Sequence, residues 1–311
     1  MVELSIDLPA GFLDDEAKTL IVPRKRKETW AVELDLLAQL NAVCRRHGIR
    51  YFCDGGTALG AVRHRGFVPW DDDIDVVMSR AEYEKLNAIA PTEFKHPYFW
   101  QTEETDPGSA RGHAQLRNSN TTGILQCEMW DGKPLCTFNQ GLFIDIFPFD
   151  NVPDDPGERS RFREELQKIV NRIWQIRECR FELRHLMFSP GSLYRACWAT
   201  MMRIREKICG GDLLTAAVMK LEQTAQRYNG DHVREMAPVS ANPHHREVLP
   251  SHFFDEAVEV PFEFMKIPVM AHHLEALAIN YGDWHEHRIG VSAHGEMFID
   301  TNRPYTEYLS G

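Results

Sequence analysis

The stretch that decides the fold is residues 52–78, FCDGGTALGAVRHRGFVPWDDDIDVVM. It starts as a short apolar strand that ends at Gly55 and Gly56, and TALGAVRHRG follows as a short helix. Glycine lets a ligand approach the backbone closely, and the first N–H groups of a helix have no intrahelical partner. The turn is therefore suited to an anion. Two glycines do not establish this alone, so the downstream aspartates have to decide.

Four aspartates, at positions 71, 72, 73 and 75, lead into the apolar run of this stretch. If the segment is extended throughout, the two-residue side-chain period places Asp71, Asp73 and Asp75 on one face and Asp72 on the other. Mutual repulsion and desolvation both oppose such a concentration of like charge. Carboxylate oxygens on one face suit a hard cation, so we expect Mg²⁺, or Mn²⁺, beside the glycine turn.

Two other interpretations of the acidic run remain open. It could be an acidic turn in water with helix-cap charges, although Ile74, Val76, Val77 and Met78 favour a buried position. It could also be the Asp-x-Asp of metal-dependent glycosyltransferases, which gives no reason for the upstream Gly-Gly-Thr. A helix-loop-helix calcium site is excluded, because the glycine and the distal glutamate are not at its spacing.

Asp145 is the third acidic position of interest. It lies in FIDIF between apolar residues, and a buried charge requires a partner. We expect it to be a third carboxylate of the cation site, on a strand next to the acidic one. The alternative is a structural salt bridge.

The rest of the chain predicts a mixed architecture. Apolar periodicity indicates a helix over 29–47 that Gly48 ends, and Ser79 with Glu82 has the spacing of a capping box for another helix. Short apolar and alternating pieces between 97 and 150 indicate a sheet, whose exit we place at Pro148, Pro153 and Pro156. We therefore divide the chain into four parts: an N-terminal arm (1–27), a core (28–156), a three-helix segment (157–230) and a C-terminal segment packing on the core (231–311).

Composition limits the classes of function. The 311 residues carry a formal net charge of -11, which argues against a nucleic-acid partner. No apolar run approaches the length of a membrane span, and the start lacks a signal-peptide pattern. Seven cysteines without a C-x-x-C pair indicate reduced thiols. We therefore expect a cytoplasmic protein without a transmembrane segment, with at most peripheral contact at the inner membrane face.

Residues 51–86, and above all GGTALGAVRHRGFVPWDDDIDVVMSRAEYEKL, closely resemble the LicD family of phosphocholine-type transferases, to which the fukutin-related enzymes belong. GLFIDIFPFDNVPDD resembles the family's third-acid strand, and LEALAINYGDW resembles its C-terminal helix. The resemblance covers most of residues 30–156 and roughly 260–284. It implies an α+β fold: a nucleotidyltransferase-like mixed sheet flanked by helices, with a mainly helical addition.

The resemblance also implies roles for single residues. Asp73 and Asp75 would bind magnesium, Asp71 would be a further ligand or an outer group, and Asp145 would help to hold the metal and could accept a proton. Donor phosphates would be held by Gly55, Gly56 and Thr57, with Arg63 as a nearby charge complement. The family usually has a lysine where this chain has Gln115. Arg117 could take over that phosphate contact, or it could be a surface arginine.

The activity implied by the resemblance is transfer of a phosphocholine group from CDP-choline to a sugar hydroxyl, with CMP as the leaving group. The acceptor would be a glycan or a glycan precursor, including a lipid-linked one. Transfer of a nucleotide from an NTP with pyrophosphate release uses the same acids and is the first alternative. A non-catalytic adaptor that binds sugar or nucleotide is the second. The donor head group, whether choline, ethanolamine, aminoethylphosphonate or another, stays open.

Overall fold

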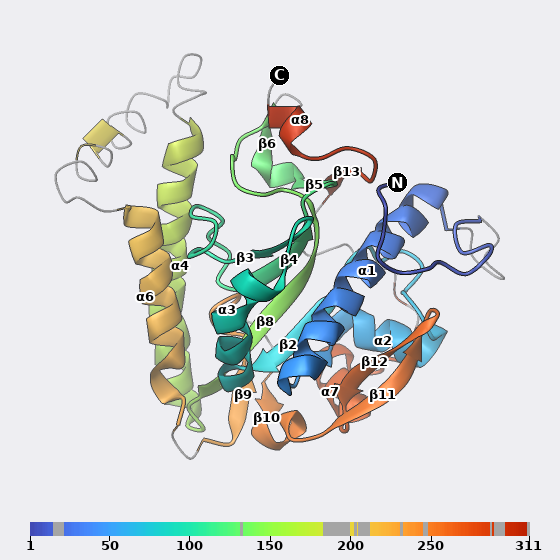
Figure 1. Cartoon of the computed structure of the whole chain (residues 1–311). Coiled ribbons are helices and arrows are strands. Elements are labelled where there is room, and N and C mark those ends of the chain that lie inside the picture. Colours follow the sequence, from blue (N-terminus) through green and yellow to red (C-terminus); the bar gives the residue numbers. More distant parts are fainter. Residues whose placement is uncertain are drawn as a thin grey trace.

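The computed structural model describes residues 1–14, 22–130, 133–182, 200–201, 204, 212–230, 233–244, 248–286, 288 and 296–309. Figure 1 shows a mixed sheet with helices packed against it and two long helices along one edge, which confirms the predicted α+β class. The central part of the expected three-helix segment, residues 183–199 and 205–211, lies outside the described residues.

The described helices are α1 (Arg24–His47), α2 (Gly55–His64), α3 (Arg80–Glu93), α4 (Pro156–Glu182), α6 (Leu213–Ala225), α7 (His273–Tyr281) and α8 (Thr306–Leu309). The strands are β1 (Phe52–Cys53), β2 (Asp75–Ser79), β3 (Tyr98–Gln101), β4 (Ala114–Asn118), β5 (Thr122–Leu125), β6 (Met129–Trp130), β7 (Lys133–Pro134), β8 (Leu142–Val152), β9 (Glu235–Ala237), β10 (Leu249–Pro250), β11 (Ala257–Phe262), β12 (Met265–Met270) and β13 (Met297–Asp300).

The main sheet has the strand order β1-β2-β8-β4-β3, with β9 and then β10 added beyond the end of β8. β2 and β8 are parallel, and the other neighbouring pairs of this sheet are antiparallel. β8 is the longest strand and pairs with β2, β4 and β9. Strands β2 and β8, which carry Asp75 and Asp145, are therefore neighbours in the middle of the sheet.

Pro148 does not end the sheet as expected, because β8 continues to Val152. The N–H of Asp145 points to β2, where it bonds the carbonyl of Ile74, so position 148 faces the opposite side of β8. On that side β4 pairs only as far as Ile146, and β9 begins at Asp150. A missing N–H in this gap costs no ladder hydrogen bond, so proline is tolerated there.

Helix α1 begins at Arg24, five residues before the predicted start, and Gly48 ends it in the left-handed conformation as predicted (φ 62°). The basic run therefore belongs to the first turn, where Lys27 is buried and its ammonium group donates to the carbonyl of Asp14. The helix packs across β8 and β4. Leu34, Leu36, Leu37 and Leu40 contribute to the main core from this helix.

Helix α3 starts after Ser79, but the predicted capping box does not form. Ser79 makes no side-chain cap hydrogen bond. The Glu82 carboxylate instead accepts hydrogen bonds from the backbone N–H of Arg50 (2.9 Å) and from Nζ of Lys85 (2.6 Å). The boundary was predicted correctly because the strand ends there, and the proposed cap contributes nothing to it.

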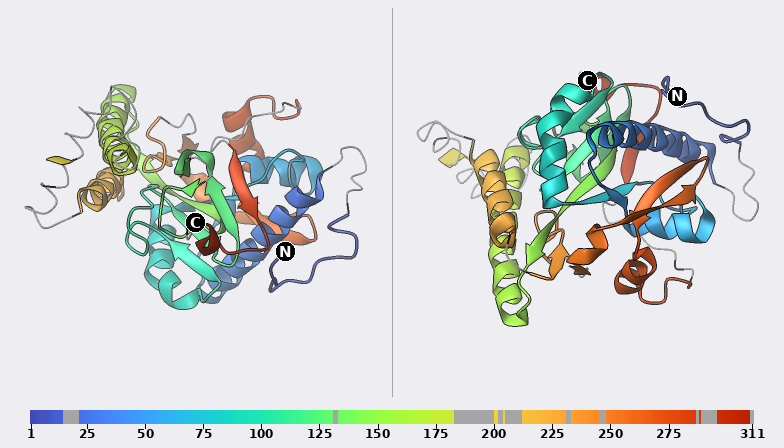
Figure 2. Two further views of the ribbon diagram at one scale, coloured as in Figure 1. Left: turned by 90° about the horizontal axis from the view of Figure 1, so that it is seen from above. Right: turned by 60° about the horizontal axis from the view of Figure 1, so that its bottom comes forward.

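Helices α4 and α6 lie side by side in both views of Figure 2 and contact each other. Apolar side chains of the two helices form a second core cluster, which includes Phe162, Leu166, Ile169, Ile173, Leu214, Val218 and Leu221. A buried ion pair ties this unit to the sheet: Arg80 of α3 donates to both carboxylate oxygens of Asp150 on β8 (2.8 and 2.7 Å) and to Glu222 of α6 (2.6 Å).

The C-terminal part adds the β11–β12 hairpin and α7. β12 contacts β1, while β11 and α7 both contact α2. Strand β13 pairs with β5 in a separate small sheet. None of the helices in the described ranges is both long and apolar enough to cross a membrane.

The Arg80–Asp150 pair predicts a large loss of stability in Asp150→Asn. Asp150 has no exposed surface, and the variant leaves the Arg80 guanidinium buried with weaker partners. We expect a loss of about 3–5 kcal/mol in the free energy of unfolding, measured by denaturant titration. The exposed pair Arg227–Glu165 is the control, because Glu165→Gln should cost less than about 1 kcal/mol. Equal costs for the two variants would contradict this.

Candidate functional site

Strand register aligns four polar side chains in one row across the sheet. Asp75 of β2 lies beside Asp145 of β8, Gln115 of β4 is opposite Asp145, and Gln101 of β3 is opposite Gln115. Directly paired residues project from the same face of a sheet. Asp145 is thus the neighbouring-strand carboxylate that the sequence predicts, and two amide side chains continue the row.

The glycine pair brings the start of α2 against the aspartates. Gly55 has φ +56°, and a Cβ there would lie 3.1 Å from Oδ2 of Asp75; a Cβ at Gly56 would overlap Oδ2 of Asp71. The hydroxyl of Thr57 accepts a hydrogen bond from the N–H of Asp75 (2.9 Å). The Gly-Gly-Thr sequence therefore lets two carboxylates approach the first turn of α2.

Strand alternation does not extend back to Asp71, contrary to the expectation, because β2 begins only at Asp75. Asp71, Asp72 and Asp73 lie in the irregular segment before it. They nevertheless act on one another: burial and the neighbouring Asp73 raise the pKa of Asp71 to about 8, with a further contribution from Asp72. Asp72 therefore adds to the negative charge around Asp71, although the sequence predicted it to lie on the opposite face.

Asp75 and Asp145 differ in pKa although they are adjacent. Burial, followed by the charges of Asp73 and Asp145, holds the pKa of Asp75 well above its usual range. Burial also acts to raise the pKa of Asp145, but His113 and Gln115 outweigh it and lower this pKa. Asp145 is consequently the acid that the protein keeps ionised.

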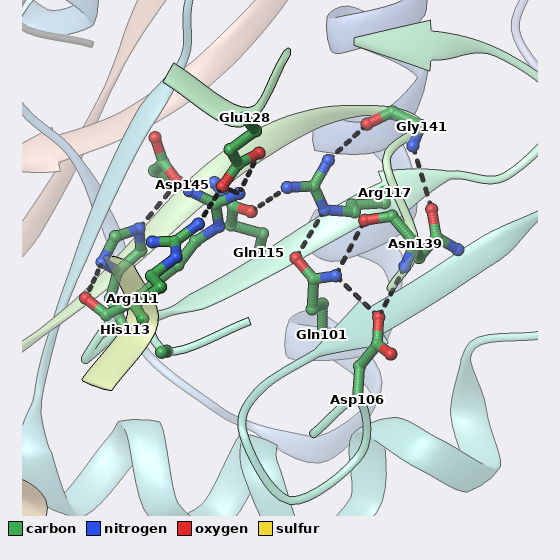
Figure 3. A network of polar contacts seen from close by, with 12 residues as sticks. Gln101, Asp106, Arg111, His113, Gln115, Arg117, Glu128, Asn139, Gly141 and Asp145 are labelled. Atoms are coloured by element: carbon green, nitrogen blue, oxygen red, sulfur yellow. Dashed lines mark hydrogen bonds and ion pairs between the residues drawn. The ribbon is translucent and has the colours of Figure 1, made fainter. Parts of the chain in front are cut away.

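Figure 3 shows the polar network that supports Asp145. Oδ1 of Asp145 accepts a hydrogen bond from Nε2 of Gln115 (2.6 Å) and lies 2.9 Å from Nε2 of His113. Nδ1 of His113 lies 3.1 Å from the carbonyl of Arg111, whose guanidinium pairs with Glu128 (2.8 Å). Glu128, which is buried, also pairs with Arg177 of α4. The network therefore links the acid strand to the helical unit.

Arg117 is buried, and its guanidinium is held by three partners within the protein. It has no exposed surface, and it donates to Oε1 of Gln101 (2.6 Å), to the carbonyl of Gly141 (2.6 Å) and to Gln115. Its guanidinium lies 4.5 Å from the ring centroid of Phe143, and burial lowers its pKa to about 9. Arg117 thus orients Gln115, which in turn holds Asp145. It is not a surface arginine, and its expected phosphate contact stays a prediction.

Thr57 and Arg63, which were also expected near the donor phosphates, lie in different surroundings. Thr57 is buried, and its hydroxyl holds the start of β2. Arg63 lies at the far end of α2, about 11 Å along the axis from Gly56. Its Nη1 approaches the carbonyls of Trp284 (3.4 Å) and Glu286 (3.5 Å), while Nε and Nη2 are buried and have no hydrogen-bond partner among the described residues. Arg63 therefore remains available to an anion, and Thr57 acts on the acid strand.

Sequence reasoning missed several residues at this site. His113 and Glu33 were not singled out, and neither were Asn280 and Tyr281 of α7. A Cβ at Gly55 would lie 3.8 Å from the hydroxyl of Tyr281, and within the described part of the chain both polar atoms of the buried Asn280 amide have no partner. Asn280 and Tyr281 both lie in LEALAINYGDW, the segment that resembles the family's C-terminal helix, so the sequence did contain an indication of these two residues. Nothing local in the sequence indicates His113.

The residues suit a hard cation by their chemistry. All the groups that act most strongly on Asp75 after burial are carboxylates: Asp73, Asp145, Asp71 and Asp54. Glu33 is acted on by Asp71, Asp72, Asp73 and Asp75, and its buried Oε2 has no hydrogen-bond partner within the described ranges. Within the described ranges, no three histidine, cysteine, aspartate or glutamate side chains already stand together as a metal site. A cation would have to draw these carboxylates together.

The fold and the site together define a nucleotidyltransferase-like domain: a strand–Gly-Gly–helix unit, an Asp-x-Asp before the next strand and a third acid on the parallel neighbour. Residues 48–171 match the model of the LicD/FKTN/FKRP nucleotidyltransferase domain. This part of the chain is thus similar to the LicD family.

Among curated proteins, the lipopolysaccharide cholinephosphotransferase LicD of Haemophilus influenzae is 34% identical over 134 residues. The match covers 42% of this chain and 46% of that protein, so the chain spans about half the length of this relative. An uncharacterized protein of Rickettsia prowazekii is 36% identical over 56 residues, which is 18% of this chain and 21% of that protein. The segment matched by the family model, residues 48–171, includes Asp71, Asp73, Asp75 and Asp145.

The position of Arg117 predicts that Arg117→Met mainly reduces stability. The variant leaves the Gly141 carbonyl and the side chains of Gln101 and Gln115 without their buried donor, so we expect a loss of about 3 kcal/mol or more in the free energy of unfolding. Denaturant titration measures it. A donor-phosphate contact would give the opposite pattern: unchanged stability with a raised KM for the donor.

Proposed function

We propose that this protein is a metal-dependent phosphotransferase that moves a phosphocholine-like group from a CDP-activated donor to a sugar hydroxyl of a glycan or glycan precursor, releasing CMP. The observation that carries the proposal is the parallel pairing that sets Asp75 beside Asp145, next to the Gly55–Gly56 helix start. The similarity to the Haemophilus relative, which is named a lipopolysaccharide cholinephosphotransferase, supports the substrate class.

Asp73, Asp75 and Asp145 would hold Mg²⁺ or Mn²⁺, with Asp71 beside them. Bound there, the cation would supply positive charge to offset the charge on the leaving CMP. The chemistry of the carboxylates supports this assignment, since burial and mutual repulsion raise the pKa values of Asp71 and Asp75. Transfer of this kind depends mainly on positioning and electrostatics.

Asp145 is the residue that we assign to the attacking hydroxyl. His113 and Gln115 keep it ionised, so it can accept the hydroxyl proton late in the reaction. Gln115 and Arg117 fix the direction of its Oδ1. The alternative is that Asp145 serves only as a metal ligand.

Donor binding is assigned to the α2 and α7 side of the site. The first-turn N–H groups at Gly55 and Gly56 would face the donor phosphates. Arg63 would complement their charge through Nε and Nη2, and Asn280 would provide further polar atoms; none of these atoms has a hydrogen-bond partner among the described residues. Helices α2 and α7 contact each other, which supports a shared role.

We further propose that the protein works in the cytoplasm, on an acceptor that can be lipid-linked, with any membrane contact peripheral at the inner face. Cys44, Cys53, Cys127 and Cys136 are free thiols in the structure, which is the pattern of a reducing compartment. The net charge of -11 speaks against nucleic acid as a partner.

The direct test is to incubate the full chain with CDP-choline, a glycan acceptor and Mg²⁺ and to measure CMP. We expect CMP and a phosphocholine-modified glycan in equal amounts, and neither in the presence of EDTA. Release of pyrophosphate from an NTP without CMP release would instead indicate a nucleotidyltransferase. No turnover of either donor, with retained nucleotide or sugar binding, would indicate an adaptor.

Asp73→Asn should abolish turnover while the fold remains intact, because it removes a cation-binding charge from an irregular segment outside the sheet. We expect a loss of at least about 10³-fold in kcat/KM, which is equivalent to about 4 kcal/mol. Circular dichroism and thermal unfolding report the fold. Asp255→Asn, at an exposed acid, is the control. Unchanged turnover in Asp73→Asn would remove Asp73 from the site.

The glycines offer a second test that separates function from folding. Gly56→Ala places a Cβ against Oδ2 of Asp71, which can move, so turnover should fall while stability changes by less than about 1 kcal/mol. Gly60→Ala, in the same helix, places its Cβ against the backbone carbonyl of Gly66. That variant should lose stability instead. Kinetics and denaturant titration of both proteins would show whether this contrast holds.

A further inference from the structure

Glu33, in the middle of α1, is a buried acid that its protein contacts do not explain. Its exposed fraction is 1%, and Oε2 is buried with no hydrogen-bond partner among the residues that the structure describes. Burying an ionised carboxylate is costly unless it is paired or hydrogen-bonded. A hydrophobic residue of similar size would pack at this position at lower cost.

One face of α1 lies along the acidic segment. Nη1 of Arg26 donates to the carbonyl of Pro69 (3.1 Å), and Nε1 of Trp30 donates to the carbonyl of Asp71 (2.9 Å). Glu33 is three residues after Trp30 and seven after Arg26, so the three side chains share this face. The backbone of the acidic segment is thus fixed to α1, with Glu33 next along the same stripe.

The electrostatic surroundings of Glu33 agree with this placement. Its pKa is raised well above the usual value, first by burial and then by the charges of Asp73, Asp72, Asp71 and Asp75. All these neighbours are of like charge, so each disfavours an ionised Glu33. A divalent cation among the aspartates would reverse the sign of this interaction.

We propose that Glu33 is a further carboxylate of the cation-binding site, which adds negative charge from α1 to the aspartates of residues 71–75 and so raises the affinity for a hard divalent cation. The inference rests on the cation dependence in the proposed function. Glu33 thus acts on the cation, and its carboxylate serves binding at the expense of the stability of the metal-free protein.

This role fixes the sign of two measurable effects. Glu33→Gln keeps the shape of the side chain and removes a like charge from the cluster. The melting temperature of the metal-free protein should therefore rise, by about 2 °C or more. The affinity for Mn²⁺ should fall by about 10-fold or more, in the range of changes around metal sites. Glu33→Asp keeps the charge and should retain most of the affinity.

Asp35, two residues further along α1, is the matched control. It has no exposed surface, but its carboxylate accepts hydrogen bonds from the N–H and hydroxyl of Ser5 (2.8 and 2.5 Å) and from the hydroxyl of Tyr98 (2.8 Å). Asp35→Asn should lower the melting temperature of the metal-free protein and leave Mn²⁺ affinity unchanged. The two buried acids of one helix should thus respond in opposite directions.

The experiment titrates the full-length protein and its variants with Mn²⁺, followed by electron paramagnetic resonance of the free ion, and records thermal unfolding with and without Mg²⁺. Weaker Mn²⁺ binding together with a higher metal-free melting temperature in Glu33→Gln would support the inference. Wild-type affinity in Glu33→Gln, or a lowered metal-free melting temperature, would overturn it while leaving the proposed function intact. Absence of Mn²⁺ binding by the wild type would overturn both.

Discussion

The parallel pairing of β2 with β8 places two buried carboxylates, Asp75 and Asp145, side by side, and the surrounding structure depends on maintaining that pair. Two like charges at neighbouring positions of a sheet repel each other, and burial strengthens the repulsion. The protein responds by treating the two acids differently. Donors are concentrated on Asp145, whereas the groups acting most strongly on Asp75 after burial are other carboxylates.

The support of Asp145 extends far beyond its immediate contacts. Gln115 donates to it, Arg117 orients Gln115, and Gln101 and Gly141 anchor Arg117. The register of β3, β4 and β8 makes this possible, since it puts Gln101, Gln115 and Asp145 in line across the sheet. Burying a guanidinium completely is costly, and here its hydrogen bonds orient Gln115 and through it the carboxylate of Asp145.

Local patterns in the sequence predicted the fold class, most helices and strands, and the neighbouring position of Asp145. Each of these depends on a short-range feature, such as a glycine stop or an apolar run flanking a charge. The role of Arg117 could not be predicted, because its partners Gln101 and Gly141 are distant in sequence and are brought together only by strand register. Glu33 was hidden for a related reason, since it lies on a helix that crosses the sheet and its neighbours are the distant aspartates.

The structure shows a second role for Gly55 and Gly56 that the sequence alone does not indicate. A phosphate-binding turn requires glycine so that a ligand can approach the backbone, but in this fold the closest side-chain atoms are carboxylate oxygens of Asp71 and Asp75. The same absence of a Cβ therefore lets negative side chains reach the positive end of α2, which offsets part of their repulsion. An incoming phosphate would meet those acids at the same helix end, where like charges repel. A cation among the acids would remove this repulsion, which is why we propose the Gly-Gly turn and the acids as one site.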